Sequence, residues 1–429
     1  MMQILKNPSK QTWAELLKRP MQEPEQIRES VTTILDDVKK NGDFALRKYT
    51  KALDGVELED FRVSPDQINQ AASRLSGSLK DAIRQSADNI RTFHQAQDGG
   101  DMRVQVHQGL ECWQKAVPMD RIGIYIPGGS APLFSSVLMM AVPARVAGCE
   151  DVVLVTPPNE QGEVDPTILY AAGQSGVSRI YMVGGAQAIA ALAYGTETIP
   201  AVDKIFGPGN QFVTLAKQLV SIEGIAIDLP AGPSEVLVVA DKDTPPGYVA
   251  ADLLSQAEHG ADSQVILLTD DESLPDKVRQ AVEEMLRDLP KRSVVEKALE
   301  SCKLVYLPGQ DEIMEMANYY APEHLIISTR NADELAGKVR HAGSVFLGDY
   351  TPESLGDYSS GTNHVLPTNG AARAYSGVNL DSFRKRITFQ KADQEGLRGI
   401  GNATMEMARA EGLEAHRRAV EIRMQTKKG

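Results

Sequence analysis

Cysteine is scarce in this sequence of 429 residues. The three cysteines, Cys112, Cys149 and Cys302, are odd in number and widely spaced, and they form no C-x-x-C pair. This pattern excludes a disulfide framework and favours a reducing compartment. Any metal site must therefore rest on nitrogen and oxygen ligands.

Excess positive charge and long apolar runs are also missing. The net charge of -13 and the pI near 5.2 argue against nucleic acid or an anionic membrane as the main partner. No run approaches the ~20 apolar residues of a membrane helix, and the first residues lack the apolar core of a signal peptide. We therefore expect a cytoplasmic protein, long enough for two or three domains.

Short apolar runs alternate with helical stretches from residue 121 onward. The predicted strands form two series, 122–126, 152–155, 180–183 and 204–206, then 236–239, 265–268, 304–306, 325–327 and 345–347. This alternation predicts an α/β fold with two parallel sheets side by side, and we expect ligands at the carboxyl ends of their strands. The residues before about 120 and after Gln394 are predicted to be mainly helical.

Three glycine-rich turns follow strands of the first series. They are Pro127 to Ser130, Gly184 to Gln187 and Gly207 to Asn210. Glycine lets the backbone approach a phosphate, and the helix behind each turn offers free N–H groups, so the turns suggest a nucleotide. None of the three contains the G-x-G-x-x-G fingerprint, so the motif does not support a standard Rossmann dinucleotide site. The alternative is that they are the tight turns found in any α/β protein.

The stretch from Ile227 to Gly260 holds a candidate metal site. A buried strand is followed by a helix that we expect from about Gly247 to His259, capped by Thr244. Gln256 and His259 then share one face of that helix, and their amide oxygen and imidazole suit a metal such as zinc. Alternatively, His259 satisfies the last helix carbonyls and Gln256 is polar surface.

The second series of strands carries the reactive side chains. Glu323 and His324 are adjacent and can divide the work of proton transfer, although they could also be a surface coincidence. Asp357 lies in a polar, glycine-rich loop and could supply a carboxylate ligand, whereas His364 in the same loop could instead bond to backbone.

Two lone histidines, His94 and His107, have no candidate partner at ligand spacing. Both are predicted to be structural. Glu411 and His416 are ~140° apart on an ideal helix, so they face one site only if the helix breaks near Gly412 or lies along the ligand. The charged tail that holds them could be a solvated face, or it could dock into a neighbouring subunit.

Several motifs in this order resemble those of one known family. They are Ile227-Asp-Leu-Pro-Ala-Gly-Pro-Ser-Glu235, Ser255-Gln-Ala-Glu-His-Gly260, Gly184-Gly-Ala-Gln-Ala-Ile-Ala-Ala-Leu192, Phe206-Gly-Pro-Gly-Asn210, Pro322-Glu-His-Leu325 and Ser360-Gly-Thr-Asn-His-Val-Leu-Pro-Thr368. The sequence resembles histidinol dehydrogenase over essentially its whole length. The resemblance implies a zinc enzyme that oxidises L-histidinol to L-histidine with NAD.

The resemblance also implies an architecture and a set of site residues. It implies two incomplete Rossmann-like domains in an intertwined homodimer, with an N-terminal helical segment at 1–24, a catalytic domain at 25–120 and 235–380, an NAD-binding domain at 121–234, and a C-terminal helical tail at 381–429. The implied zinc ligands are Gln256, His259, Asp357 and, from the partner subunit, His416. Glu323 and His324 would be the acid/base pair. The implied substrate contacts are Ser234, Glu411, His324 and the zinc ligands, and the implied NAD contacts are Tyr125, Gln187 and Asn210.

Two other classes of protein could use the same residues. A zinc hydrolase needs the acid, the imidazole and the metal, but not the three glycine turns. A binding protein with two α/β lobes needs only a cleft. A cysteine thiohemiacetal route to the acid is disfavoured, because none of the three cysteines lies in a motif.

Overall fold

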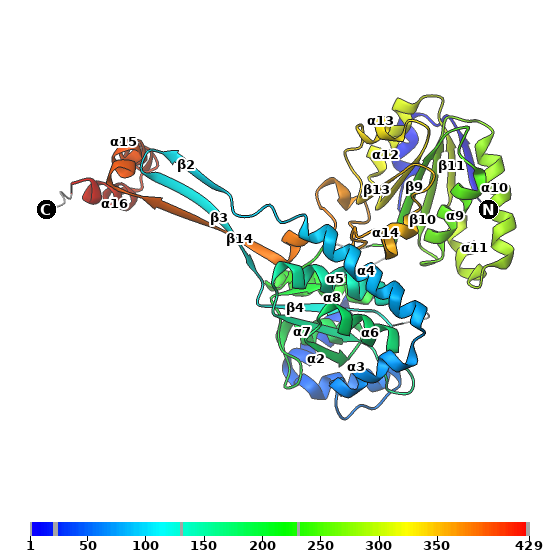
Figure 1. Cartoon of the computed structure of the whole chain (residues 1–429), viewed down its shortest axis with the longest axis horizontal. Helices are drawn as coiled ribbons and strands as arrows, with labels where there is room; N and C mark the ends of the chain where they lie inside the picture. Colours follow the sequence, from blue (N-terminus) through cyan, green and yellow to red (C-terminus); the bar gives the residue numbers. More distant parts are fainter. Residues whose placement is uncertain (1, 20–24, 129–131, 230–231, 426–429) are drawn as a thin grey trace.

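The computed structural model describes residues 2–19, 25–128, 132–229 and 232–425, which form two parallel α/β units and a projecting arm (Figure 1). The first sheet has the order β6-β5-β4-β7-β8, and all its strands are parallel. Its strands are β4 (Arg121–Tyr125), β5 (Asp151–Thr156), β6 (Arg179–Met182), β7 (Lys204–Phe206) and β8 (Ala226–Ile227).

Helices cover both faces of this first sheet. They are α2 (Glu25–Tyr49), α3 (Pro65–Ala71), α4 (Gly77–Gln95), α5 (Phe134–Ala147), α6 (Pro166–Ser175), α7 (Gly185–Tyr194) and α8 (Gln211–Ile222). Ile122 and Ile124 pack into one core with α4, α5 and α6, whereas Val153 and Val155 pack into the other with α2, α7 and α8. Burial on both faces explains why these strands have continuous apolar runs.

The second sheet has the order β1-β11-β10-β9-β12-β13 and is also entirely parallel. Its strands are β1 (Gln3–Lys6), β9 (Glu235–Ala240), β10 (Gln264–Thr269), β11 (Lys303–Tyr306), β12 (His324–Ser328) and β13 (Ser344–Leu347). Its helices are α1 (Trp13–Leu16), α9 (Pro246–Ala257), α10 (Leu274–Met285), α11 (Arg292–Glu300), α12 (Gln310–Tyr320), α13 (Ala332–Ala336) and α14 (Glu353–Tyr358).

The arm is an antiparallel sheet that ends in two helices. Its elements are β2 (Arg103–His107), β3 (Leu110–Pro118), β14 (Arg384–Ala392), α15 (Gln394–Ala410) and α16 (Glu414–Gln425). Trp113 of β3 stacks on Phe389 of β14 with ring centroids 5.3 Å apart. The arm extends away from both α/β units and carries α15 and α16 at its tip (Figure 1).

The structure confirms every predicted strand within a residue or two and corrects parts of the expected layout. Strands β1, β2, β3 and β14 lie in stretches expected to be helical. Helices α2, α3 and α4 pack on α7, α6 and α5 of the first sheet, whereas residues 25–120 were expected to join residues 235–380. Pro245, not Thr244, is the N-cap residue of α9, and the Thr244 hydroxyl instead accepts from Asp241 N and donates to Ser328 O.

The expectation that ligands bind at the carboxyl ends of the strands is wrong for the second sheet. The glycine turns do follow the carboxyl ends of β4, β6 and β7, apart from Gly129 and Ser130, which lie outside the described residues. Glu323 and His324, however, lie at the amino end of β12, beside Glu235 at the amino end of β9.

Within the described residues, none of the helices combines the length and apolar character needed to span a bilayer.

Candidate active site

A cavity of about 170 Å³ lies between the two α/β units and is lined by both. The first unit contributes the start of α5, the turn after β7 and the segment after β8, including Ser136, Gly207 and Asp228. The second unit contributes the residues that the sequence singled out. Those that line the cavity are Ser234, His259, Glu323, His324, Asp357 and His364.

His324 is buried, and its two ring nitrogens face different surroundings. Nδ1 lies 3.2 Å from Glu235 O, 3.6 Å from Glu353 Oε1 and 3.7 Å from Glu323 Oε2. All three atoms are acceptors, so Nδ1 carries a hydrogen. Nε2 has no hydrogen-bond partner among the described residues and lies 3.6 Å from Asp357 Oδ1. In the neutral ring, Nε2 is therefore the basic nitrogen.

Glu323 is held in place by the backbone of the neighbouring strand. Its Oε2 accepts a hydrogen bond of 2.9 Å from the N–H of Glu235. Burial raises the pKa of Glu323 to about 7, with the nearby carboxylates of Glu235 and Asp357 adding to the shift. A carboxyl with this pKa can exchange a proton near neutral pH.

The charge balance of the cavity is negative. Burial raises the pKa of Glu353 well above its ordinary value. Burial alone would lower the pKa of His324, but the carboxylates of Glu353, Glu323 and Asp357 outweigh it and raise this pKa to about 10. Among the described residues that line the cavity there is no lysine or arginine, so the imidazolium is the cation that offsets these carboxylates.

Two of the four expected metal ligands, His259 and Asp357, line this cavity, and the Gln256 amide contacts Glu353 beside it. Gln256 is fully buried at the end of α9, and His259 lies in the turn just after that helix. Asp357 comes from α14. Burial lowers the pKa of His259 although much of its side chain is open to solvent, and the Asp357 carboxylate opposes that shift.

Ligand atoms of His324, Glu353 and Asp357 lie within 4.8 Å of one another. This group shares only Asp357 with the ligand set that the sequence resemblance implies. Divalent cations are bound where several carboxylate and imidazole atoms meet in this way, so the described residues fit a cation here.

His364 bonds to backbone, which was the alternative considered from the sequence. Its Nδ1 lies 2.9 Å from Asp357 O, and its Nε2 lies 3.1 Å from the Ser136 hydroxyl of the first unit. His364 therefore links the segment that carries Asp357 to the helix α5. His94 also bonds to backbone, through Ile90 O, and His107 lies on the exposed strand β2.

The three residues expected to contact a nucleotide lie at the carboxyl end of the first sheet. The Tyr125 hydroxyl accepts a hydrogen bond of 3.3 Å from Gly185 N. Gln187 is fully buried, and neither its Oε1 nor its Nε2 has a hydrogen-bond partner among the described residues. Asn210 caps α8 by accepting from the N–H groups of Phe212 and Val213. Its amide nitrogen remains available to a ligand.

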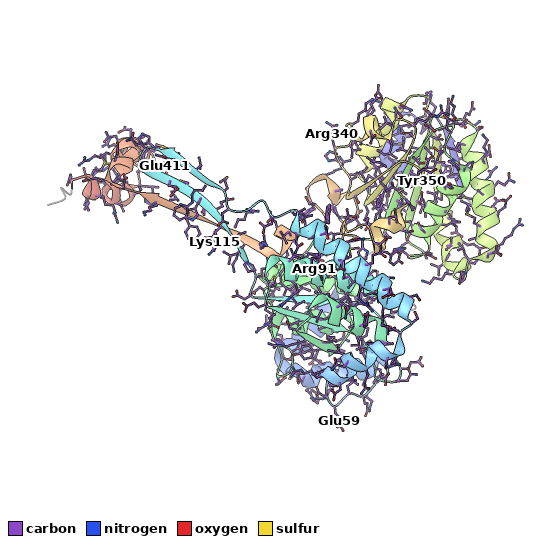
Figure 2. All side chains as sticks on the ribbon, in the orientation of Figure 1. Glu59, Arg91, Lys115, Arg340, Tyr350 and Glu411 are labelled. Atoms are coloured by element: carbon purple, nitrogen blue, oxygen red, sulfur yellow. The ribbon has the colours of Figure 1, made fainter. Side chains whose placement is uncertain are left out.

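Glu411 and His416 are not brought to the cavity within one chain. Both are exposed in the arm, where Glu411 follows α15 and His416 lies in α16. Figure 2 shows Glu411 at the far end of the arm, away from the two α/β units.

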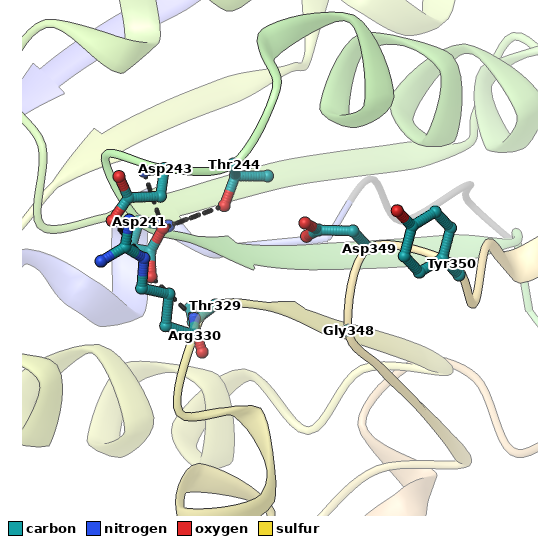
Figure 3. Close-up of a pocket in the computed structure, with 8 residues that line it drawn as sticks. All are labelled: Asp241, Asp243, Thr244, Thr329, Arg330, Gly348, Asp349 and Tyr350. Carbon is teal, nitrogen blue, oxygen red and sulfur yellow. Dashed lines mark hydrogen bonds and ion pairs between the residues drawn. The ribbon is translucent and has the colours of Figure 1, made fainter.

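A second cavity of about 230 Å³ lies at the carboxyl ends of β9, β12 and β13 (Figure 3). Most of its polar groups are paired with one another. Asp241 accepts from the N–H groups of Asp243 and Arg330, and Arg330 Nε lies 2.8 Å from Asp243. We place the chemistry in the first cavity, because the catalytic candidates face that one.

The residues that support Glu323 and His324 were not predicted from the sequence. Arg19 pairs with buried Glu235 (Nε to Oε1, 2.5 Å), donates to Tyr320 O and lies over the Tyr320 ring. Ala321 has a φ of 54°, which is rare for a residue with a side chain and costs conformational energy. A single sequence gives no signal for Arg19, which lies 216 residues from Glu235. Glu353 had a weak signal, because it precedes Asp357 by four residues and shares its helix face.

Comparison with known proteins finds relatives over nearly the whole chain. The family model described as histidinol dehydrogenase matches residues 17–424. The chain is 54% identical to histidinol dehydrogenase from Bacteroides thetaiotaomicron over 428 residues, which is 100% of both chains. It is 49% identical over 413 residues to that from Xylella fastidiosa, covering 96% of each. The crystal structure of histidinol dehydrogenase from Elizabethkingia anophelis matches with a TM-score of 0.97 and 50% identity over 99% of this chain and 98% of that one.

Proposed function

The chain belongs to the histidinol dehydrogenase family, and from this premise we propose that it oxidises L-histidinol through the aldehyde to L-histidine, with zinc and NAD. The observation that carries the proposal is the buried pair Glu323 and His324 at a cavity shared by the two α/β units. A homodimer with a shared active site belongs to the same proposal, as does the cytoplasmic location expected from the sequence.

The zinc part of the proposal rests on the donors that meet at the cavity. Gln256, His259 and Asp357 would hold the ion, with His416 of the partner subunit as the fourth ligand. When bound, zinc supplies a Lewis acid that holds and orients the substrate's imidazole and amine. A cation held beside Asp357 would offset the carboxylates that raise the pKa of His324, so Nε2 would be free to accept a proton.

The NAD part of the proposal rests on the first sheet. Gln187 is a buried amide without a hydrogen-bond partner among the described residues, which is costly unless a ligand completes it. Tyr125 and the turn Gly207 to Asn210 lie at the same end of the sheet, where open α/β sheets bind nucleotides. When bound there, NAD supplies the hydride acceptor for both oxidation steps.

The chain's own residues then perform the proton transfers. His324 Nε2 accepts the proton of the substrate hydroxyl in the first oxidation. Glu323, as the carboxylate, accepts a proton from the water that adds to the aldehyde, and the resulting hydrate is oxidised in the second step. Ser234 lines the cavity and would contact the substrate, with Glu411 of the arm as a further contact.

The other classes considered from the sequence are excluded, since the chain is an oxidoreductase of this family. The structure also disfavours a cysteine intermediate. Burial raises the pKa of Cys149 to about 11 and that of Cys302 to about 12, so neither is a ready nucleophile. Cys112 lies on β3 of the arm.

The stoichiometry of NADH tests the proposed reaction. A limiting amount of L-histidinol is added to the zinc-loaded protein with excess NAD, and absorbance measures the NADH formed. Two NADH per histidinol are expected because both oxidations occur in one site. One NADH would show that the reaction stops at the aldehyde and that Glu323 has another role. No NADH from folded, metal-loaded protein would overturn the proposal.

Replacing Glu323 with Gln tests the assigned base directly. We expect histidine formation to slow by about 10²–10⁴-fold, because Gln accepts no proton from water. Zinc content and the melting temperature should stay near those of the unmodified protein. In the unmodified protein the rate should rise as the pH increases through about 7, since the carboxylate form is the base. Unchanged turnover in the variant would refute the role.

A further inference from the structure

Glu353 is a buried carboxylate to which no role has been assigned, and it lies beside the proposed metal site. It is the first residue of α14 and only 1% exposed. Asp357 lies four residues later on the same helix, so the two side chains share a face. A carboxylate buried this deeply is costly unless hydrogen bonds or cations offset it, so its partners indicate what it does.

The first partner of Glu353 is the side-chain amide of Gln256. The amide nitrogen donates to Glu353 Oε1, and the amide oxygen lies 2.9 Å from Glu235 N, whose hydrogen it shares with Glu323 Oε2. The opposite orientation would set the amide oxygen against a carboxylate and the nitrogen against an N–H donor, which is repulsive. Glu353 therefore fixes which end of the Gln256 amide carries the oxygen, and that oxygen keeps a second lone pair for a ligand.

The second partner of Glu353 is the ring of His324. Glu353 Oε1 lies 3.6 Å from His324 Nδ1, on the side of the ring where Nδ1 also meets Glu235 O at 3.2 Å. A carboxylate on this side favours the tautomer with its hydrogen on Nδ1. It thereby leaves Nε2, which faces Asp357, without a hydrogen.

We propose that Glu353 is a positioning residue for both halves of the site: it orients the Gln256 amide toward the metal and the His324 ring toward the substrate. This inference rests on the proposed function and deepens it. Carboxylates that orient metal ligands in this way commonly change metal affinity by about 10–100-fold when they are removed.

The rival role for Glu353 is direct ligation of the metal. One of its carboxylate oxygens belongs to the group of ligand atoms within 4.8 Å that also includes His324 and Asp357. The contact with Gln256 argues against ligation through Oε1, because that oxygen already accepts the amide hydrogen. A test must therefore separate a lost ligand from a disoriented one.

The test measures metal affinity in Glu353→Gln and Glu353→Ala. Zinc is titrated into metal-free protein against a competing chelator, and cobalt(II) loading gives a visible spectrum that reports the ligand set. The Glu258→Gln variant is the matched control, because it removes one carboxylate close to His259 without touching Gln256. The melting temperature of each metal-free variant checks that it is folded.

We expect zinc affinity to fall by about 10–100-fold in Glu353→Ala and less in Glu353→Gln, whose amide oxygen can still accept from Gln256. The cobalt spectrum should keep its band positions, and Glu258→Gln should bind like the unmodified protein. Unchanged affinity in both Glu353 variants would overturn the assignment, and an altered cobalt spectrum would overturn it in favour of direct ligation. Neither measurement needs turnover, so failure here is distinct from failure of the unmodified protein to form NADH.

Discussion

Asp54 is a single residue whose buried carboxylate lowers the stability of the fold when it is ionised. It ends the helical turn Thr50–Asp54, and its Oδ2 has no hydrogen-bond partner among the described residues. Burial raises its pKa from the ordinary 3.8 to about 6. A carboxyl group whose pKa is raised by folding does not destabilise the fold while it is protonated. It destabilises the fold as the pH rises through its pKa in the folded state.

The Asp54→Asn variant should therefore be more stable than the unmodified protein at pH 8 and equally stable near pH 4. At pH 8 we expect the melting temperature to rise by about 2–4 °C, the shift that a gain of ~1 kcal/mol gives in a domain of this size. Thermal unfolding followed by circular dichroism at both pH values measures the difference. Asp36→Asn, at an exposed position of α2, is the control. An equal gain at both pH values would contradict the explanation.

The residues that carry chemistry were recognisable from the sequence only where a motif marks them. Glu323 and His324 stand adjacent in such a motif, and the structure places both at the cavity. Glu235, Arg19 and Glu353 were missed because their role arises from contacts between segments far apart in the chain. Local patterns do not contain that information.

Among the secondary-structure elements, buried strands were predictable and exposed strands were not. Strands β9 and β10 are buried at every position and have continuous apolar runs. Strand β2 is exposed at every position, and β14 is nearly so, which left both without the continuous apolar run that marks a buried strand. Glu323 and His324 directly precede the predicted strand 325–327, so their amino-end position followed from the sequence. The general rule for α/β sheets nevertheless placed the ligand site at the other end of that strand.

A buried ion pair holds the turn after β7 that we assign to NAD. Lys217 of α8 and Asp228 after β8 lie 2.5 Å apart and are almost fully buried. Lys217 donates to Gly207 O and Asp228 accepts from Gly207 N, both at 2.8 Å. The turn needs this support, since Gly207 has a φ of 128° and a Cβ there would lie 2.1 Å from Tyr125 O.

Replacing Lys217 with Met should destabilise the protein by about 3–5 kcal/mol, because it leaves the Asp228 carboxylate buried and unpaired. The double variant Lys217→Met with Asp228→Asn should recover part of that loss, since no uncompensated charge remains. Denaturant unfolding measures both free energies. Equal losses in the single and double variants would show that packing, not charge, explains the effect.

In the molecule as a whole, the arm is the part whose role a single chain does not explain. It carries exposed apolar side chains at Val106, Met407 and Ile422, together with the exposed Glu411 and His416. Its projection away from the α/β units in Figure 1 leaves these residues far from the cavity of the same chain. A second copy of the chain would cover the apolar residues and could receive Glu411 and His416 at its own cavity.

A mixture of two inactive variants tests this sharing. Glu323→Gln damages the cavity of its own chain, and His416→Ala damages the arm. If the arm serves the partner's cavity, a dimer of one chain of each kind has one site with both lesions and one intact site. Unfolding and refolding an equal mixture should then restore about a quarter of the unmodified activity, because ~half of the dimers are mixed and half of their sites are intact. Each variant refolded alone is the control and should stay inactive. If His416 instead acted within its own chain, every site in the mixture would carry one lesion, and no activity would return.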